Sequence, residues 1–161
     1  MSTTKIPRAK LAQIASFLEQ KRFAMVGVSR NPREISRLLL KEFKQRGYKV
    51  VLVNPSANEI EGELCYARMQ DITPPVEAAL VLTSPAWTEQ VVRECAEAGV
   101  KRVWLYGTSN PNKVSEAALQ FCREQGIDVI PGECPFMFLA GSGFVHGAHG
   151  VINKFFGAYP K

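Results

Sequence analysis

The residues best suited to chemistry lie in a short turn, residues 27–32, which reads Gly-Val-Ser-Arg-Asn-Pro and follows an apolar run. Asn31 can accept a hydrogen bond from the first turn of a helix, and Pro32 suits the first helical position because no amide hydrogen is needed there. A helix that begins here leaves backbone N–H groups free at its positively polarised end. Three arginines add full charges: Arg30, Arg33 and Arg37. The turn therefore predicts a site for a phosphate-bearing ligand.

This turn differs from the usual dinucleotide-binding loop. That loop reads G-x-G-x-x-G, because its glycines allow the backbone to approach a pyrophosphate closely. Here Val-Ser-Arg-Asn-Pro follows Gly27, so the later glycines are absent. The pattern disfavours ordinary NAD binding.

A second group of reactive residues comprises Cys134, His146 and His149, which could serve as a nucleophile and a base beside a thioester. The sequence shows neither a helix start that would lower the thiol pKa nor an acid that would orient an imidazole. Two histidines without a clear third ligand are insufficient for a metal site. The four cysteines include no Cys-x-x-Cys pair and are expected to be reduced thiols. We therefore predict no catalytic residue and no metal.

The elements that must position the turn follow a recurrent order of apolar strand, polar residue with proline, amphipathic helix and glycine. The polar–proline pairs are Asn31-Pro32, Ser84-Pro85 and Asn110-Pro111, and the glycine stops are Gly47, Gly99 and Gly126. This order is typical of right-handed βαβ crossovers. It predicts a single α/β domain with a Rossmann-like open parallel sheet of about five strands and helices on both faces. Ligands of such sheets bind outside the carboxyl ends of the strands.

The helical periodicity also predicts which side chains face the sheet. Between residues 9 and 21 the expected inner face is Leu11, Ile14, Ala15 and Leu18. In the helix after the first strand it is Ile35, Leu38, Leu39 and Phe43. In the helix that begins at Pro85 it is Trp87, Val91, Cys95 and Ala98.

Composition narrows the class of protein. The chain has 161 residues, of which 46% are hydrophobic and 22% charged, as in an ordinary globular domain. Its net charge is +5, but the basic residues are scattered and do not alternate with aromatic ones, so we predict no nucleic-acid partner. No apolar window is long enough for a membrane span and no signal-peptide core follows the first residues. We expect a cytoplasmic protein without membrane contact.

Several motifs, in this order, resemble the CoA-binding domain family, small cytosolic proteins similar to the nucleotide-fold domain of the succinyl-CoA synthetase alpha subunit. The motifs are Val-Gly-Val-Ser-Arg-Asn-Pro at 26–32, Gly-Tyr-Lys-Val-Val-Leu-Val-Asn-Pro at 47–55, Glu-Gly-Glu-Leu-Cys-Tyr at 61–66, Pro-Pro-Val-Glu at 74–77, Val-Trp-Leu-Tyr at 103–106 and Cys-Pro at 134–135. The resemblance implies a CoA-binding Rossmann-like domain with an N-terminal helix over residues 1–136. Residues 137–161 would be an extension that packs on the same domain or on a partner in a homodimer.

The resemblance also implies a set of ligand contacts. Gly27, Ser29, Arg30 and Pro32, with Val28 and Asn31 between them, would hold the CoA phosphates. Asn54 and Pro55 would lie along the adenosine. Ser84, Pro85, Tyr106 and Gly107 would flank the diphosphate and the pantetheine arm. Many members of the family have Trp-Leu-Gln where this chain has Trp-Leu-Tyr, so the last two contacts depart from the family pattern.

The function expected from these observations is that of a binding module. It would hold coenzyme A or an acyl-CoA, a small nucleotide ligand, without turning it over by itself, because the sequence shows neither the phosphohistidine domain nor the ligase partner of the synthetase. The alternative is a nucleotide-dependent enzyme, either an acyl transferase or an NAD(P)-dependent reductase. An enzyme would need a nucleophile or a base within reach of the ligand, whereas a binding module needs backbone donors and arginine.

Overall fold

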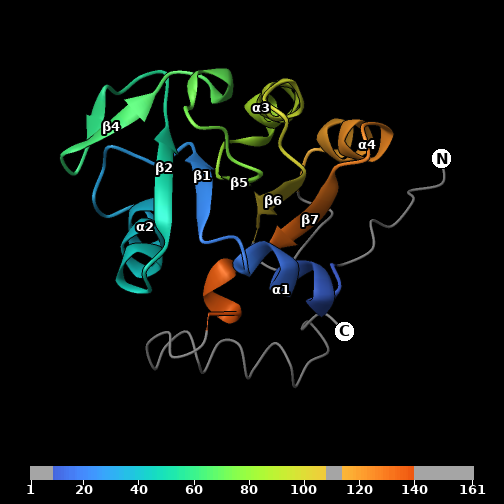
Figure 1. Cartoon of the computed structure of the whole chain (residues 1–161), viewed down its shortest axis with the longest axis horizontal. Helices are drawn as coiled ribbons and strands as arrows, with labels where there is room; N and C mark the ends of the chain where they lie inside the picture. The colour runs from blue at the N-terminus through green and yellow to red at the C-terminus, as the bar shows by residue number, and fades with distance from the viewer. Residues whose placement is uncertain (1–8, 108–113, 140–161) are drawn as a thin grey trace.

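The computed structural model describes residues 9–107 and 114–139, which form one sheet with helices on both faces (Figure 1). In chain order the elements are α1 (Leu11–Leu18), β1 (Arg22–Val26), α2 (Ile35–Gln45), β2 (Lys49–Val53), β3 (Glu59–Ile60), β4 (Glu63–Tyr66), the 3-10 turn η1 (Met69–Asp71), β5 (Ala78–Val81), α3 (Pro85–Glu97), β6 (Arg102–Tyr106), α4 (Glu116–Glu124), β7 (Asp128–Glu133) and the 3-10 turn η3 (Pro135–Met137). The predicted α/β class is confirmed.

The sheet has seven strands in the order β3-β4-β2-β1-β5-β6-β7. Every pair is parallel except β3 with β4, so the parallel part has the strand order of a Rossmann fold. The sheet exceeds the five expected strands because a short hairpin, β3–β4, adds to the edge of β2. The order reverses at β1, since the chain passes first to β2 on one side and later to β5 on the other. This reversal is where such sheets bind ligands.

The strands are apolar throughout because both faces of the sheet are covered. On one face Phe23 of β1 meets Phe17 of α1 and Phe43 of α2, with ring centroids 5.3 and 4.9 Å apart. The opposite face packs on α3 and α4 through Val92 and Leu119. Two aliphatic and aromatic cores therefore hold β1 at the centre of the molecule, and its carboxyl end has a fixed position.

The helix ends follow the prediction more closely than the helix faces. Gly47, Gly99 and Gly126 all have a positive φ where a helix ends, as predicted. In α1, however, Ile14 and Phe17 are buried while Leu11 and Ala15 are exposed, so that part of the predicted inner face is wrong.

Two further errors concern residues near the candidate site. Leu38 of α2 is 47% exposed and Trp87 of α3 is 63% exposed, although both were predicted to face the sheet. In α3 the inner position is taken by Thr88, whose hydroxyl donates to the Ser84 carbonyl oxygen at 2.9 Å. A threonine that satisfies its hydroxyl in this way can be buried, and the helix is then rotated so that Trp87 points outward.

The prediction for the C-terminal part of the chain can be compared with the structure only in part. Helix α4 begins at Glu116 and not near Pro111, and the Ser115 hydroxyl caps it by accepting from the Ala118 amide at 3.2 Å. Asn110 and Pro111 lie outside the described residues, as do residues 140–161 of the predicted extension. Phe138 and Leu139, which belong to that extension, pack on the core that contains Trp104.

Among the described helices none has both the length and the apolar character that crossing a membrane requires.

Candidate functional site

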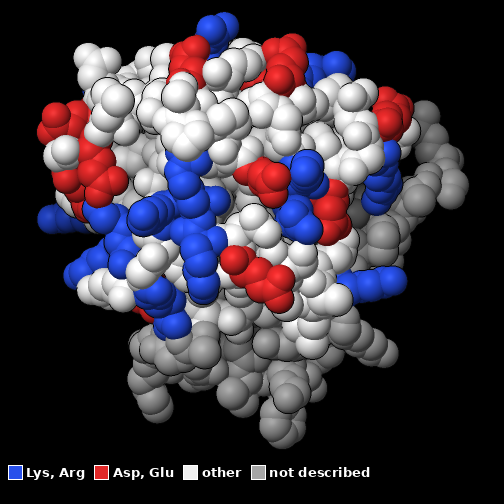
Figure 2. Space-filling view, in the orientation of Figure 1, with Lys and Arg blue, Asp and Glu red and all other residues white. Residues whose placement is uncertain are grey.

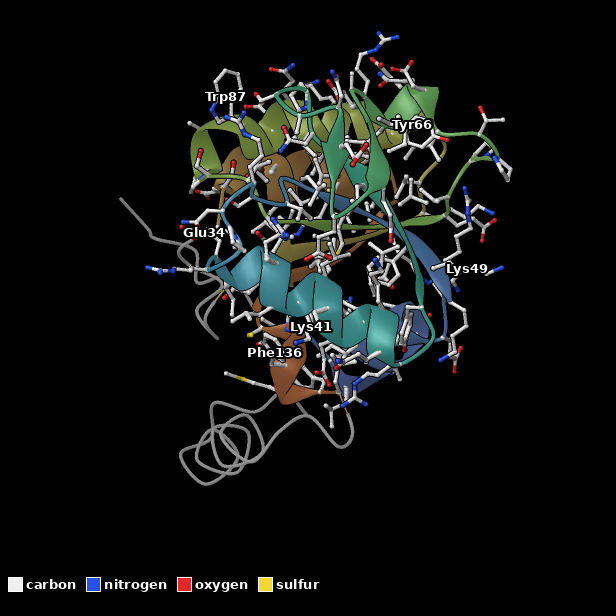
Figure 3. All side chains as sticks on the ribbon, turned by 90° about the vertical axis from the view of Figure 1, so that its left-hand side faces the viewer. Glu34, Lys41, Lys49, Tyr66, Trp87 and Phe136 are labelled. Carbon is white, nitrogen blue, oxygen red and sulfur yellow. The ribbon has the colours of Figure 1, made fainter. Side chains whose placement is uncertain are left out.

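The candidate site lies at the carboxyl edge of the sheet, where β1 is flanked by β2 and β5. Val26 at the end of β1 pairs with Val53 at the end of β2 and with Val81 at the end of β5. The three following segments therefore emerge side by side. Figure 3 places Glu34 and Trp87, which belong to two of these segments, at one side of the molecule, and Lys49, the first residue of β2, at the opposite side.

Gly27 is required at this junction for two independent reasons. Its φ is +92°, a value that residues with a side chain rarely adopt. A Cβ on it would also meet the Thr83 backbone nitrogen at 3.2 Å and the Thr83 methyl group at 3.1 Å. The turn after β1 is thus pressed against the turn after β5, and no side chain separates the two.

The amides of residues 29–33 are largely occupied by the protein itself. Ser29 donates to the Ser36 hydroxyl at 2.9 Å, Asn31 to the Ser29 hydroxyl at 3.0 Å, and Arg33 to the Asn31 side-chain oxygen at 3.0 Å. The prediction that this turn presents its amides free is therefore wrong for these three groups. Within the described chain the amides of Val28 and Arg30 donate no hydrogen bond.

The predicted helix start is also displaced. The Glu34 amide donates to the Asn31 carbonyl oxygen at 3.1 Å, which closes a turn with Pro32 at its second position. Helix α2 begins only at Ile35 and has Glu34, not Asn31, in the capping position. The reason is local: an asparagine side chain that bonds the backbone two residues on stabilises a turn in competition with a helix.

Arg37 of α2 holds this loop in place through hydrogen bonds from its side chain. Its guanidinium donates to the Arg30 carbonyl oxygen at 3.1 Å and to the Ser29 carbonyl oxygen at 3.4 Å, and it pairs with Glu61 at 2.8 Å. Figure 2 shows acidic side chains over the β3–β4 hairpin beside basic side chains over α2 and β2. Because Glu61 compensates its charge, Arg37 is a poor candidate for the predicted role of attracting phosphate. Arg30 and Arg33 are exposed and pair with no described acid.

Asn54 joins the loop to the sheet. Its side-chain amide donates to the Val28 carbonyl oxygen at 2.9 Å, and its side-chain oxygen accepts from the Ser56 amide at 2.8 Å. Its own backbone amide donates to Tyr66 at the end of β4, also at 2.9 Å. Through its side chain and its backbone amide, Asn54 therefore ties the ends of β1, β2 and β4 together.

A cleft of about 540 Å³ opens beside this junction on the α3 face. One side is formed by the ends of β1, β2 and β4, and the other by α3. The lining residues are Val26, Gly27, Val53, Asn54, Pro55, Ser56, Ala67, Arg68, Thr83, Trp87, Gln90, Val91 and Glu94. The volume is within the range of small-molecule sites, about 300–1,000 Å³.

The cleft contains three of the predicted residues, Gly27, Asn54 and Pro55. Residues 28–32 form the adjoining loop. Sequence reasoning missed Arg68 after β4 and the row of cleft residues on α3: Trp87, Gln90, Val91 and Glu94. Their spacing in the sequence could have indicated that they act together, because positions 87, 90, 91 and 94 share one face of a helix.

A second cavity of about 100 Å³ lies between the ends of β5 and β6 and includes two predicted residues, Pro85 and Tyr106. Thr83 lines both cavities and so marks their meeting point. Ser84 and Gly107 line neither one. Gly107 is instead packed on Gly132, since a Cβ at residue 107 would lie 2.5 Å from the Gly132 Cα.

Tyr106, which lines this second cavity, interacts with Cys134. Burial raises the pKa of Tyr106 to about 12, with a further contribution from Cys134. Burial also raises the pKa of the Cys134 thiol, although hydrogen bonds from Phe136 and Tyr106 oppose the shift. The thiol is thus protonated at neutral pH, which disfavours its use as a nucleophile. His146 and His149 lie outside the described residues, among which no cluster of three potential metal ligands occurs.

Comparisons with known proteins identify a family and several relatives. A family model described as a CoA binding domain matches residues 21–140. The uncharacterized protein YneT of Bacillus subtilis is 28% identical over 124 residues, which cover 76% of this chain and 89% of YneT. The alpha subunit of an ADP-forming acetate–CoA ligase II of Pyrococcus furiosus is 27% identical over 125 residues, but these cover 73% of this chain and only 27% of the subunit. A hypothetical protein from Pyrococcus horikoshii OT3 has a similar structure, with a TM-score of 0.73, 26% identity and coverage of 84% of this chain and 93% of that one.

Proposed function

The chain belongs to the CoA-binding domain family, and from this premise we propose that it binds coenzyme A or an acyl-CoA without turning it over by itself. The observation that carries the proposal is the cleft at the strand-order reversal, bordered by a glycine turn and two exposed arginines. Anionic nucleotides bind at such turns because backbone amides and cations converge there.

The diphosphate is assigned to the loop of residues 27–32. The backbone amide of Arg30, which donates to no described group, and the side chains of Arg30 and Arg33 supply donors and charge. Val28 is fully buried and supports the loop from the core side. Ser29 and Ser36 now accept hydrogen bonds from loop amides through their hydroxyl groups. A hydroxyl is also a donor, so each can turn its proton to a phosphate oxygen when the ligand enters.

The sizes of the two cavities suggest which way the ligand runs. CoA has a bulky adenosine at one end and a thin, flexible pantetheine arm at the other. The larger cleft beside Asn54 and Pro55 suits the adenosine, and the smaller cavity beside Pro85 and Tyr106 suits the arm. Ser84 and Gly107 then flank the path between phosphate and arm. Thr83, which lines both cavities, lies where the diphosphate would pass.

Absence of turnover is part of the proposal, and the protonated Cys134 thiol supports it.

The described cysteines are all free, in keeping with the reducing cytoplasm that we propose as the location. For residues 137–161 we propose that the extension packs on the same domain or on a partner in a homodimer. The alternative function, a nucleotide-dependent acyl transferase or NAD(P)-dependent reductase, differs in that it requires a group that reacts with the bound ligand.

A ligand panel tests the proposal directly. Thermal unfolding would be measured with CoA, acetyl-CoA, dephospho-CoA, NAD, NADP and AMP. A ligand at about 100 times its dissociation constant stabilises the fold by roughly 2.7 kcal/mol, which gives a clear rise in the melting temperature. We expect CoA or acetyl-CoA to give the largest rise and to be recovered unchanged after incubation. A response restricted to NAD or NADP would contradict CoA binding, and consumption of acetyl-CoA would favour the enzyme.

A further inference from the structure

One aromatic residue at the cleft has no role in the site described so far. Trp87 lies in the first turn of α3, lines the cleft, and keeps 63% of its surface exposed. Figure 3 shows its side chain projecting from the ribbon at the outer end of α3. Large aromatic side chains gain free energy when they are buried, so an exposed indole at the mouth of a cleft marks a surface that a ligand can cover.

The wall opposite α3 suits a flat ring. Pro55 after β2 and Ala67 after β4 face the cleft from the sheet side, and Trp87 and Val91 face it from α3. All four side chains are apolar. The same cleft is also lined by polar residues: Asn54, Ser56, Arg68, Thr83, Gln90 and Glu94. A ligand part with two apolar faces and a polar edge fits this distribution, and a purine base has that character.

The position of Trp87 is fixed by its neighbours in α3. Pro85 occupies the first helical position, and the Thr88 hydroxyl contacts both the Ser84 carbonyl oxygen at 2.9 Å and the Thr83 hydroxyl at 3.0 Å. Thr88 is buried, so the helical turn that carries the indole cannot rotate toward the sheet without breaking these bonds. The backbone under Trp87 is thereby preorganised, which lowers the entropic cost of ligand binding.

We propose that Trp87 is a ligand-binding residue that stacks on the adenine ring of the bound ligand. The inference rests on the proposed function and adds a recognition element for adenine on α3, across the cleft from Asn54 and Pro55. Stacking of a base on an aromatic side chain corresponds to a change of roughly 5- to 150-fold in affinity. The effect should follow the adenine part of the ligand and be absent for the pantetheine part.

The chain allows an intrinsic fluorescence test. It has two tryptophans, and the other one, Trp104, is fully buried with its indole N–H donating to the Glu133 carbonyl oxygen at 2.9 Å. A change in emission on titration with ligand therefore reports chiefly on Trp87. We expect quenching by CoA and by ADP and no change with phosphopantetheine.

Two variants supply the affinity measurement, with calorimetry as the readout. Trp87→Leu keeps an apolar side chain without an aromatic face and should weaken binding of CoA and ADP about tenfold, while Trp87→Phe should retain most of the affinity. Leu38→Ala removes another exposed apolar side chain, which does not line the cleft, and should leave both affinities unchanged. Melting temperatures of the free variants should match the wild type because Trp87 is mostly exposed.

The outcomes separate this inference from the function on which it rests. If wild-type protein binds CoA without a change in emission and Trp87→Leu binds it equally well, the role of Trp87 is overturned and CoA binding stands. If phosphopantetheine quenches and ADP does not, the ligand runs in the opposite direction and the adenine assignment is overturned. If no CoA compound binds the wild-type protein, the proposed function fails first.

Discussion

The two strand-to-helix junctions that meet at the site look alike in sequence and differ in structure. Both end a buried strand and continue into a polar residue followed by proline, at Asn31-Pro32 and at Ser84-Pro85. After β1 the proline lies inside a turn and α2 starts three residues later, at Ile35. After β5 the proline is the first residue of α3 itself.

The difference comes from the side chain before each proline. Asn31 bonds the Arg33 amide and closes a turn, whereas the Ser84 side chain makes no capping hydrogen bond and leaves Thr88 to bond its carbonyl oxygen. The first junction is therefore a polar loop, and it is there that we propose a phosphate binds. In the second junction the first turn of α3 is held in place by the Thr88 hydroxyl, and Trp87 is exposed at the cleft. One junction suits charge recognition and the other suits shape recognition.

The largest effect is expected where the two junctions touch. Gly27→Ala introduces a Cβ at a φ of +92° and within 3.1–3.3 Å of Thr83 and Leu82. Backbone strain and overpacking together should lower the free energy of unfolding by about 3 kcal/mol. Gly47→Ala is the matched control, because Gly47 has a φ of +85° with no atom near its missing Cβ. Urea denaturation measures both, and equal losses would show that the contact between the junctions contributes nothing.

The next prediction isolates the charge of the first junction. Arg30→Ala should weaken CoA binding roughly tenfold, because a hydrogen bond to a charged group contributes about 1.5–3 kcal/mol and an exposed site recovers part of it. Lys41→Ala removes an exposed cation farther along α2 and should change the affinity little. Calorimetry at two salt concentrations gives the readout. An unchanged affinity for Arg30→Ala, with wild-type binding intact, would remove Arg30 from the site.

A smaller effect concerns the rigidity of the second junction. Thr88→Val keeps the shape of the side chain and removes the hydroxyl that bonds the Ser84 carbonyl oxygen. We expect a loss of about 1 kcal/mol in the free energy of unfolding, measured in urea. Asn31→Ala, in the exposed loop, should cost less than this. If Asn31→Ala costs more than Thr88→Val, the first junction is the stiffer of the two and our comparison is reversed.

The last effect is absent at neutral pH and appears only at alkaline pH, beside the second junction. Burial raises the pKa of Tyr106 from 10.0 to about 12, so the native state holds the phenol proton where the unfolded chain releases it. Stability is therefore complete below the unfolded pKa and falls as the pH rises toward the folded one. Melting temperatures should decline above pH 10.0 and less steeply in Tyr106→Phe. Buried Cys95 and Cys122, whose thiol pKa values are also raised, keep part of the decline in that variant, and identical slopes would contradict the burial of Tyr106.

Much of this arrangement could be predicted from local patterns. Apolar runs predict the parallel strands, glycines predict the helix ends, and the order of strands and turns predicts that Gly27, Asn54 and Pro55 lie together at the carboxyl edge, where they line one cleft. The errors have a common cause. Whether Trp87 or Thr88 faces the sheet depends on a rotation of one position in a helix, and periodicity alone resolves that rotation poorly when both neighbours can be buried.

The amino-acid sequence by itself determined the α/β class and the family to which the chain belongs, because these depend on periodicity and on the order of short motifs. It also predicts the edge of the sheet at which we propose that a ligand binds. Only the tertiary structure decided which loop amides are occupied, that Arg37 is paired with Glu61, and that Trp87 stands at the cleft. Those features arise from contacts between residues far apart in the chain, such as Asn54 with Val28. A local pattern states what a residue can do, and the fold selects the partner with which it does it.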